Sequence, residues 1–368
     1  MSIDKTTNGQ YRARWRTPDG ASRSKTFARK VDAVAHLADV NVSSAKGAYV
    51  DTKAGKITFG VYARQWASSQ PHRVNTAASV EQILRVHAFP AWEHRHMASI
   101  RPSEVQAWVS GLQLAPSTVK VVYGKVAAIF RAAVDDRIVV HTPCNPRSIK
   151  MPRADGVEVT PMSAGEVRSM IAGVGDRYSA LILLLAGTGL RPAEALGLTV
   201  DRVNFLKRSI RIDRQLVTAA GATPVLAPTK TESSVRTIPV PQSVLDALAR
   251  HLEEYGPGPW GLIFTDSKRD PIRRNALGHV WRRAAAVATV TDRTPHDLRH
   301  YAASAMIHQG ASVKAVQRHL GHASATTTLD TYAHMWPDTE DVTRRALEAG
   351  LSEIVSPMCQ EAATVRDA

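Results

Sequence analysis

The sequence predicts a multidomain protein that is mainly α-helical and carries small β-sheets. Three observations lead to this fold class. Near the N-terminus, two strand patterns joined by a tight turn precede a helical pattern. Two polar stretches, residues 45–56 and 143–156, have the composition of linkers. Elsewhere, apolar residues recur mostly with the spacing of amphipathic helices. A chain of 368 residues is long enough for two or three domains.

Composition indicates a soluble protein with a polyanionic partner. The chain carries a net charge of +14 and a pI of about 10.0, with 44% hydrophobic residues. Its longest apolar run, residues 180–186, is too short to span a bilayer, and the N-terminus lacks the apolar segment of a signal peptide. Two cysteines make no disulfide framework. We therefore expect a cytoplasmic, nucleoid-associated location without membrane contact.

Residues 1–50 are expected to form a three-stranded sheet backed by a helix. The strand at 10–16 alternates, with Tyr11 and Trp15 on one face and arginines on the other. A turn at 17–20 leads to a second strand at 22–27, and residues 2–5 supply another. The helix at 30–42 is expected to carry Val34, Leu37, Ala38 and Asn41 along one side, and Tyr11 and Trp15 are expected to pack on it near Leu37.

This N-terminal sheet is predicted to bind DNA. Residues 1–56 hold 11 Lys/Arg against 5 Asp/Glu, a net charge of +6. A two-stranded ribbon can enter the major groove and place basic side chains on phosphates and base edges. The alternative is a hairpin whose arginines are only solvated. The candidate DNA-binding residues here are Arg12, Arg14, Arg16, Arg23 and Lys25.

Residues 57–142 are expected to form a small helical bundle. Phe59, Tyr62 and Trp66 share one stripe, and further helices are predicted at 79–87, 103–111 and 117–134. The bundle contains no catalytic constellation. Three histidines at 87, 94 and 96 lack a suitably spaced cysteine or acidic partner, so solvated histidines are favoured over a metal site.

Residues 158–355 are expected to form an α+β domain, followed by a tail at 356–368. A capping box at 163–166 opens a helix, and a buried helix follows at 178–186. Strands are predicted at 209–213 and as a pair formed by 225–227 and 235–240. The remaining helices are predicted at 242–255, 273–288, 297–309, 313–320 and 325–332.

Within this domain, separate motifs supply groups suited to attack on a phosphodiester. Tyr332 is a candidate nucleophile, but a phenol with a free pKa near 10 needs a base or a positive field. Arg191 and Arg299 can clamp one phosphate and stabilise its transition-state charge. Lys230 can protonate the departing 5′ oxygen, and which of it and His296 is the main proton donor stays open. The candidate catalytic residues are Arg191, Lys230, His296, Arg299, His322 and Tyr332.

In this order and spacing, the motifs resemble the tyrosine recombinase family, specifically the integrases of phages and integrative elements. The resemblance covers almost the whole chain. It rests on Thr188–Leu196 with Arg191, on Pro228-Thr229-Lys230-Thr231 with Arg236, on His296-Asp297-Leu298-Arg299-His300, and on Leu320-Gly321-His322 followed by Tyr332. Glu194 stands where the family has an acidic residue that supports the active site. Arg236 is added to the candidate DNA-binding residues.

The resemblance implies site-specific DNA recombination. Tyr332 would form a 3′-phosphotyrosine and release a 5′ hydroxyl, so no cofactor or metal is expected. It also implies an arm-binding domain at 1–50, a core-binding domain at 57–142 and a homotetramer on double-stranded DNA with core and arm sites. A DNA-bending host factor and an excision directionality factor are expected partners. Residues 340–355 are expected to dock on a neighbouring protomer.

Other functions remain as alternatives at this point. A type IB topoisomerase would use much the same catalytic groups, but it would act as a monomer without an arm-binding module. A chromosome-dimer resolving recombinase is closer, but such enzymes typically lack the N-terminal sheet. A DNA-binding regulator with a decayed active site would not be expected to keep all six catalytic side chains.

Overall fold

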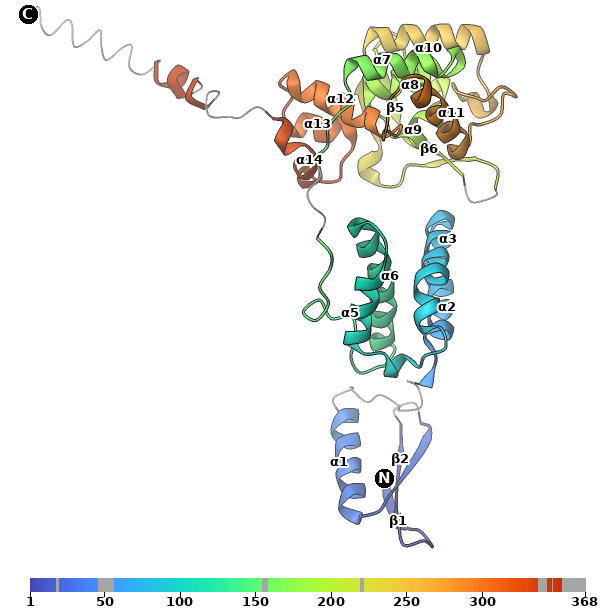
Figure 1. The fold of residues 1–368 in the computed structure, drawn as a ribbon, viewed down its shortest axis with the longest axis vertical. Helices are drawn as coiled ribbons and strands as arrows, with labels where there is room; N and C mark the ends of the chain where they lie inside the picture. The colour runs from blue at the N-terminus through green and yellow to red at the C-terminus, as the bar shows by residue number, and fades with distance from the viewer. Residues whose placement is uncertain are drawn as a thin grey trace, which may run out of the picture. The chain divides into compact units, whose positions relative to one another are not determined.

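The computed structural model describes residues 1–17, 20–45, 56–153, 158–218, 222–336, 343–345 and 347–352. The chain divides into two compact units, Met1–Gly156 and Val157–Ala368. The described part is mainly helical with small antiparallel sheets (Figure 1). The predicted fold class is therefore confirmed.

The N-terminal region forms a three-stranded sheet covered by one helix. Strands β1 (Ser2–Lys5), β2 (Tyr11–Arg16) and β3 (Ser22–Phe27) pair antiparallel in sequence order, and helix α1 (Lys30–Ala45) packs on β2 and β3. Trp15 packs with Leu37 and Val40, and the ring of His36 meets it edge-on at 4.9 Å. Trp15 therefore anchors the helix to the sheet, as its place on the apolar face predicts.

The buried stripe of α1 differs from the predicted one. Ala33 and Val40 are buried and Leu37 is partly buried, whereas Val34 is 50% exposed. These three positions follow the three- and four-residue spacing of one helical face.

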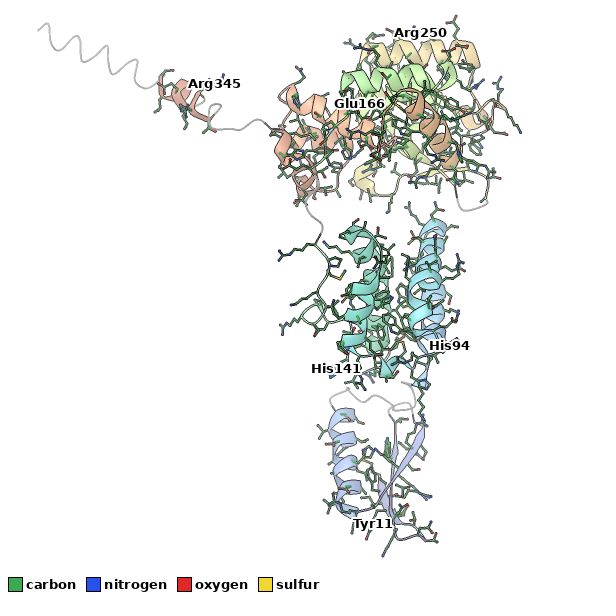
Figure 2. The ribbon with its side chains drawn as sticks, viewed as in Figure 1. Tyr11, His94, His141, Glu166, Arg250 and Arg345 are labelled. Carbon is green, nitrogen blue, oxygen red and sulfur yellow. The ribbon has the colours of Figure 1, made fainter. Side chains whose placement is uncertain are left out.

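The helical bundle consists of α2 (Phe59–Ser69), α3 (Val74–Ile83), α4 (Phe89–Trp92), α5 (Pro102–Gly111) and α6 (Pro116–Asp135). Its core is aromatic: the ring of Phe59 lies 5.6 Å from that of Phe130 and 5.8 Å from that of Trp92. His94, labelled in Figure 2, is exposed in the loop after α4. Within the described ranges, no three His, Cys, Asp or Glu side chains are grouped so as to hold a metal ion.

The helix predicted at 79–87 begins earlier and ends in a different geometry. It starts at Val74 and passes through a π-turn at Leu84–Ala88 (η2) into α4. The N–H of Phe89 donates to the carbonyl of Leu84, and Pro90 comes next with no N–H to donate. The wider turn immediately precedes this proline and lets the helix continue into α4.

The second unit is built around the buried helix α8 (Asp176–Thr188). Leu181, Leu184 and Leu185 on this helix are fully buried. α7 (Ala164–Gly173), α10 (Gln242–Tyr255) and α12 (Asp297–His308) pack against it. The short helix α9 (Pro192–Leu196) follows α8, and α11 (Arg274–Val287) packs on α7. Figure 1 shows α12 grouped with α13 (Val313–Leu320) and α14 (Ala325–Tyr332).

The strand pairing in this unit corrects the sequence prediction. β7 (Val225–Pro228) pairs with β6 (Arg214–Val217), whereas β8 (Arg236–Pro239) pairs with β5 (Ser209–Ile212) in a sheet that also holds β4 (Val203–Asn204). The predicted pair of 225–227 with 235–240 is therefore wrong. The β6 segment lacks a clear two-residue alternation, so its hairpin with β7 was not visible, and the chain between β7 and β8 crosses to another sheet.

The chain after α14 is described only in part. Residues 347–352 are helical, and Leu347 and Leu351 are 63% and 53% exposed. Of the segment 340–355 that is expected to dock on a neighbouring protomer, residues 340–342, 346 and 353–355 lie outside the described residues, as does the predicted tail at 356–368. Among the helices that are described, none combines the length and apolar character needed to cross a membrane.

Candidate active site

A buried carboxylate organises two arginines at the start of α9. Glu194 is 4% exposed and accepts hydrogen bonds from Arg191 Nη1 at 2.8 Å and Arg236 Nη2 at 2.9 Å. Its Oε2 also accepts from the backbone N–H of Arg191, which closes a capping box. Burial opposes the ionisation of Glu194, but the two guanidiniums outweigh it and hold its pKa below the usual value.

Three arginines from different elements converge on the end of α13. The carbonyl of His319 accepts from Arg236 Nε at 2.8 Å, and that of Leu320 accepts from Arg299 Nη2 at 2.8 Å. The carbonyl of Gly321 accepts from Arg191 Nη2 at 3.2 Å. The last carbonyls of a helix lack partners within it and carry its negative dipole end. The helix end therefore positions all three guanidiniums.

Gly321 suits this meeting point for two reasons. Its φ is +68°, the left-handed conformation that ends a helix and favours glycine. A Cβ at this position would lie 2.9 Å from Arg236 Nη1 and 3.1 Å from its Cζ. The absence of a side chain therefore keeps the space in which Arg236 binds.

The arginine cluster has an excess of positive charge. Arg191 and Arg236 bind Glu194, and Arg299 also lies within electrostatic reach of it. The side chain of Arg191 is 36% exposed, whereas Arg299 is 2% exposed. Arg299 also donates Nη1 to the carbonyl of Gly189 at 2.8 Å. Burial and the neighbouring Arg191 charge lower the pKa of Arg299 to about 9, but a guanidinium keeps its proton at neutral pH. Such a site favours an anion, which would reach Arg191 first.

Tyr332 lies at the end of α14, enclosed beside this cluster. It is 1% exposed, and its Oη lies 2.9 Å from His300 Nδ1. The ring of His322 is nearly parallel to that of Tyr332, with a 9° angle and 6.4 Å between centroids. Burial raises the pKa of Tyr332 to about 12, although the charge of Arg299 opposes this. The phenol is therefore protonated at neutral pH in this structure.

The two predicted histidines are neutral at pH 7. His322 Nδ1 lies 2.9 Å from the Thr328 hydroxyl, and burial together with the arginine charges lowers the pKa of His322 to about 4. His296 precedes α12, where one side of the residue is exposed to solvent and the other lies against neighbouring side chains. Partial enclosure, the His300 ring 5.2 Å away and the charge of Arg299 lower the pKa of His296 as well. Neutral imidazoles can donate hydrogen bonds or take up protons.

Lys230 is exposed in the connection between β7 and β8. The N–H of Thr229 donates to the carbonyl of Asp213 at 3.3 Å, which fixes the start of this connection. The connection ends at Arg236, which belongs to the arginine cluster. The connection thus ties the segment that carries Lys230 to the site.

Arg236 does not lie where a DNA-binding residue was expected. Its side chain is 6% exposed, and its hydrogen bonds run to Glu194, Ser234 and His319. We therefore assign it a supporting position rather than a direct DNA contact. The sequence also missed His300, although its place directly after Arg299 and four residues after His296 put it on the same helical face.

The basic residues of the N-terminal sheet divide between its two faces. Arg12, Arg14 and Arg16 are exposed on the face away from α1, and their β3 partners are Thr26, Ser24 and Ser22. On the other face, Arg23 is paired with Trp15 and Lys25 with Ala13; Lys25 Nζ lies 5.3 Å from the Phe27 ring centroid. The five residues therefore do not share one surface. Arg14 Nε also lies 3.3 Å from Asp4 Oδ2.

Comparison with known proteins shows which sequences this chain resembles. The profile of the phage integrase family matches residues 162–338. The putative prophage phiRv2 integrase of Mycobacterium tuberculosis is 26% identical over 333 residues, covering 88% of each chain. The integrase of Mycobacterium phage D29 is 25% identical over 309 residues, covering 81% of each chain. The tyrosine recombinase XerD of Corynebacterium glutamicum is 32% identical over 164 residues, covering 44% of this chain and 50% of that protein.

Solved structures share the fold. The Tn1549 transposon integrase (residues 82–397) in complex with a circular intermediate DNA matches with a TM-score of 0.69 at 23% identity, covering 78% of this chain and 98% of that one. A lambda integrase dimer bound to a COC′ core site matches with a TM-score of 0.61 at 15% identity, covering 92% of this chain and 97% of that one.

Proposed function

The chain is a tyrosine recombinase whose residues 162–338 belong to the phage integrase family, and we propose that it joins phage or mobile-element DNA to a host chromosome through a 3′-phosphotyrosine on Tyr332. The observation that carries the assignment of the residues is the position of Tyr332 within electrostatic reach of Arg299, one of the three arginines that bind the carbonyls at the end of α13. A phenol beside excess guanidinium charge suits nucleophilic attack on a phosphate.

Each group in the site has a role in this transesterification. Arg191 and Arg299 bind the scissile phosphate, and Glu194 with Arg236 holds Arg191 in place. Tyr332 Oη attacks phosphorus, forming the O–P bond while the bond to the 5′ oxygen breaks. Lys230 protonates the departing oxygen, and His296 and His322 donate hydrogen bonds to the phosphate. The 5′ hydroxyl of the partner strand then attacks the phosphotyrosine, which restores Tyr332.

The partners follow from the same premise. Core-site DNA would lie against residues 57–142 and 158–355, and arm-site DNA against residues 1–50. A solved structure of a lambda integrase tetramer bound to a Holliday junction matches this chain with a TM-score of 0.58. Exposed Leu347 and Leu351, one helical turn apart, offer a surface for a neighbouring protomer in a comparable homotetramer. A DNA-bending host factor and an excision directionality factor would assist it.

Coverage favours integration over chromosome-dimer resolution. The putative prophage phiRv2 integrase aligns with 88% of this chain, whereas a XerC-like tyrosine recombinase of Caldanaerobacter subterraneus aligns with 60% and the XerD protein with 44%. A type IB topoisomerase would relax supercoiled DNA without exchanging sites, which the assay below distinguishes.

Integration can be tested in cells with a non-replicating plasmid that carries this gene and its flanking DNA. We expect insertion at one chromosomal locus, with both junctions sharing a short crossover sequence, and no insertion with Tyr332→Phe. Absence of insertion with the unaltered gene, or insertion with the Tyr332→Phe gene, would overturn the proposal.

A further inference from the structure

The hydroxyl of Tyr332 has a partner to which the proposed mechanism gives no role. Its Oη lies 2.9 Å from His300 Nδ1, and the two ring centroids are 5.6 Å apart. Among the residues that the structure describes, His300 is the hydrogen-bond partner of this hydroxyl. The phenol proton therefore lies between Tyr332 Oη and His300 Nδ1.

The position of His300 follows from the helix that carries it. α12 brings Arg299 into the arginine cluster, and the next residue projects to the side of the helix, towards α14. His300 also lies one turn after His296, whose ring is perpendicular to it at 5.2 Å. One short helical segment therefore supplies a phosphate clamp and a contact to the nucleophile.

Of the three nearby histidines, His300 is the one placed to take the proton of Tyr332. His322 is stacked on the phenol ring, and its Nδ1 lies 2.9 Å from the Thr328 hydroxyl. His296 contacts His300 rather than the phenol and faces solvent, where a phosphate would bind. Stacking and ring contact do not provide a path for a proton, whereas a hydrogen bond does.

We propose that His300 is a further catalytic residue, the general base that holds the Tyr332 hydroxyl through Nδ1 and accepts its proton as Oη attacks phosphorus. This inference rests on the proposed function. In the step, the Oη–H bond breaks and the proton moves to Nδ1, giving an imidazolium. The Oη–P bond forms, the bond from phosphorus to the 5′ oxygen breaks, and that oxygen takes a proton from Lys230. During rejoining, each proton returns to its donor.

The charges around His300 favour a neutral ring that is ready to accept. Asp297, Arg299 and Arg293 act on it from its own helix and the segment before, with His296 one turn back and Tyr332 facing it from α14. Burial lowers the pKa of His300, with Asp297 opposing and the two arginines adding to the effect. A neutral His300 accepts at Nδ1 when its other nitrogen, Nε2, carries the ring proton.

The burial of Tyr332 makes proton transfer before attack unfavourable, since its pKa is raised to about 12. The transfer is therefore expected to accompany O–P bond formation, when the phenol oxygen becomes more acidic. General base catalysis of this kind contributes roughly 10²- to 10⁴-fold to a rate.

The test measures single-turnover cleavage by the full-length protein on a nicked duplex that carries the crossover sequence found by the integration assay. His300→Ala removes the base. His300→Asn keeps a hydrogen-bond acceptor near the position of Nδ1 but cannot take up a proton. His308→Ala serves as the matched control, because it removes an exposed histidine from the same helix whose Nδ1 lies within hydrogen-bond distance of Ser304. Binding of the same duplex verifies that each variant is folded.

We expect both His300 variants to bind DNA normally and to form the covalent adduct about 10²- to 10³-fold more slowly, with His308→Ala unchanged. The deficit should shrink as pH rises, because hydroxide replaces the missing base. Added imidazole should partly restore His300→Ala. A normal rate in His300→Asn would show that positioning alone matters, and faster cleavage by His300→Ala would show that the contact restrains Tyr332. Either result overturns the proposal.

A second substrate separates the two proton transfers. When the scissile phosphate carries a 5′-bridging sulfur, the leaving group is a 5′ thiolate, which needs no proton. This substrate should therefore restore cleavage by Lys230→Ala but not by His300→Ala. Rescue of His300→Ala by this substrate would assign His300 to the leaving group and overturn the inference. If Tyr332→Phe still forms an adduct, the proposed function itself fails. If Tyr332→Phe forms no adduct but the His300 variants cleave at the normal rate, the proposed function stands and the inference about His300 alone is lost.

Discussion

Arg236 and Glu194, which are 42 positions apart in the sequence, form a buried two-point ion pair. Nη2 lies 2.9 Å from Oε2, and Nη1 lies 3.3 Å from Oε1. The guanidinium side chain is 6% exposed and the carboxylate side chain is 3% exposed. Glu194 also binds Arg191, the partly exposed arginine of the cluster. The ion pair between Arg236 and Glu194 therefore fixes the position of Arg191.

Glu194→Gln should destabilise the catalytic unit, because it leaves Arg236 buried without its counter-charge. Breaking a buried ion pair by removing one partner costs about 3–5 kcal/mol. Thermal melting, with hydrogen exchange of the peptides covering α9 and β8, measures the effect. Glu253→Gln on the exposed face of α10 is the control and should change stability by less than about 0.5 kcal/mol. Equal melting of the two variants would contradict the role of the pair.

The same pair predicts a direction of pH dependence. The pKa of Glu194 is below its usual value in the folded protein, so its ionised form stabilises the fold. That stabilisation is fully present above the unfolded pKa of about 4.3 and is lost as pH falls through the lower folded pKa. Melting temperatures of wild type and Glu194→Gln should therefore converge in acid. A gap that stays constant down to pH 2 would exclude ionisation of Glu194 as the cause.

Arg191→Lys and Arg299→Lys should each lose cleavage on the order of 10²-fold or more, although the charge is kept. Arg191 bridges Glu194 and the carbonyl of Gly321, and Arg299 bridges the carbonyls of Gly189 and Leu320. A single ammonium cannot reproduce a planar two-point contact. Arg299→Lys should also lower the melting temperature more than Arg191→Lys, since Arg299 is the more buried of the two. Near-normal adduct formation by either variant would remove that arginine from the clamp.

Gly321→Ala should impair cleavage through Arg236. The left-handed φ of +68° costs a non-glycine residue about 1–2 kcal/mol, and the new Cβ would meet Arg236 Nη1 at 2.9 Å. Gly310 provides a matched control, with a φ of +78° and no atom within 4 Å of a Cβ. Gly310→Ala should therefore show the conformational cost alone. Equal cleavage rates in the two variants would mean that the position of Arg236 does not matter for the reaction.

The two faces of the N-terminal sheet give different expectations for arm-site binding. Arg12→Ala and Arg16→Ala should each reduce the salt dependence of binding by about one unit, because each side chain is proposed to contact one phosphate. Lys25→Ala, on the face towards α1, should leave the slope unchanged. Fluorescence anisotropy over a salt series measures the slopes. Deletion of residues 1–56 should abolish arm binding and leave core-site cleavage intact, and unchanged footprints after this deletion would contradict an arm-binding role.

Sequence by itself determined the helices, the N-terminal sheet and the spacing of the motifs. Local rules explain this success: two-residue alternation fixes the faces of β2, and four-residue spacing places His296 and His300 on one side of α12. The same rules fail where a pattern is weak or several helical faces are apolar. They missed β6, and they assigned Val34 rather than Ala33 to the buried face of α1.

Only the tertiary structure decided how the site is assembled. Arg191 and Gly321 are 130 positions apart, and the pairing of three arginines with three consecutive carbonyls depends on how the start of α9, α12 and β8 lie around the end of α13. No local preference encodes such contacts. For the same reason, the sequence assigned Arg236 to DNA, whereas the packed structure buries it against Glu194, because a buried carboxylate requires a charge partner that sequence spacing does not reveal.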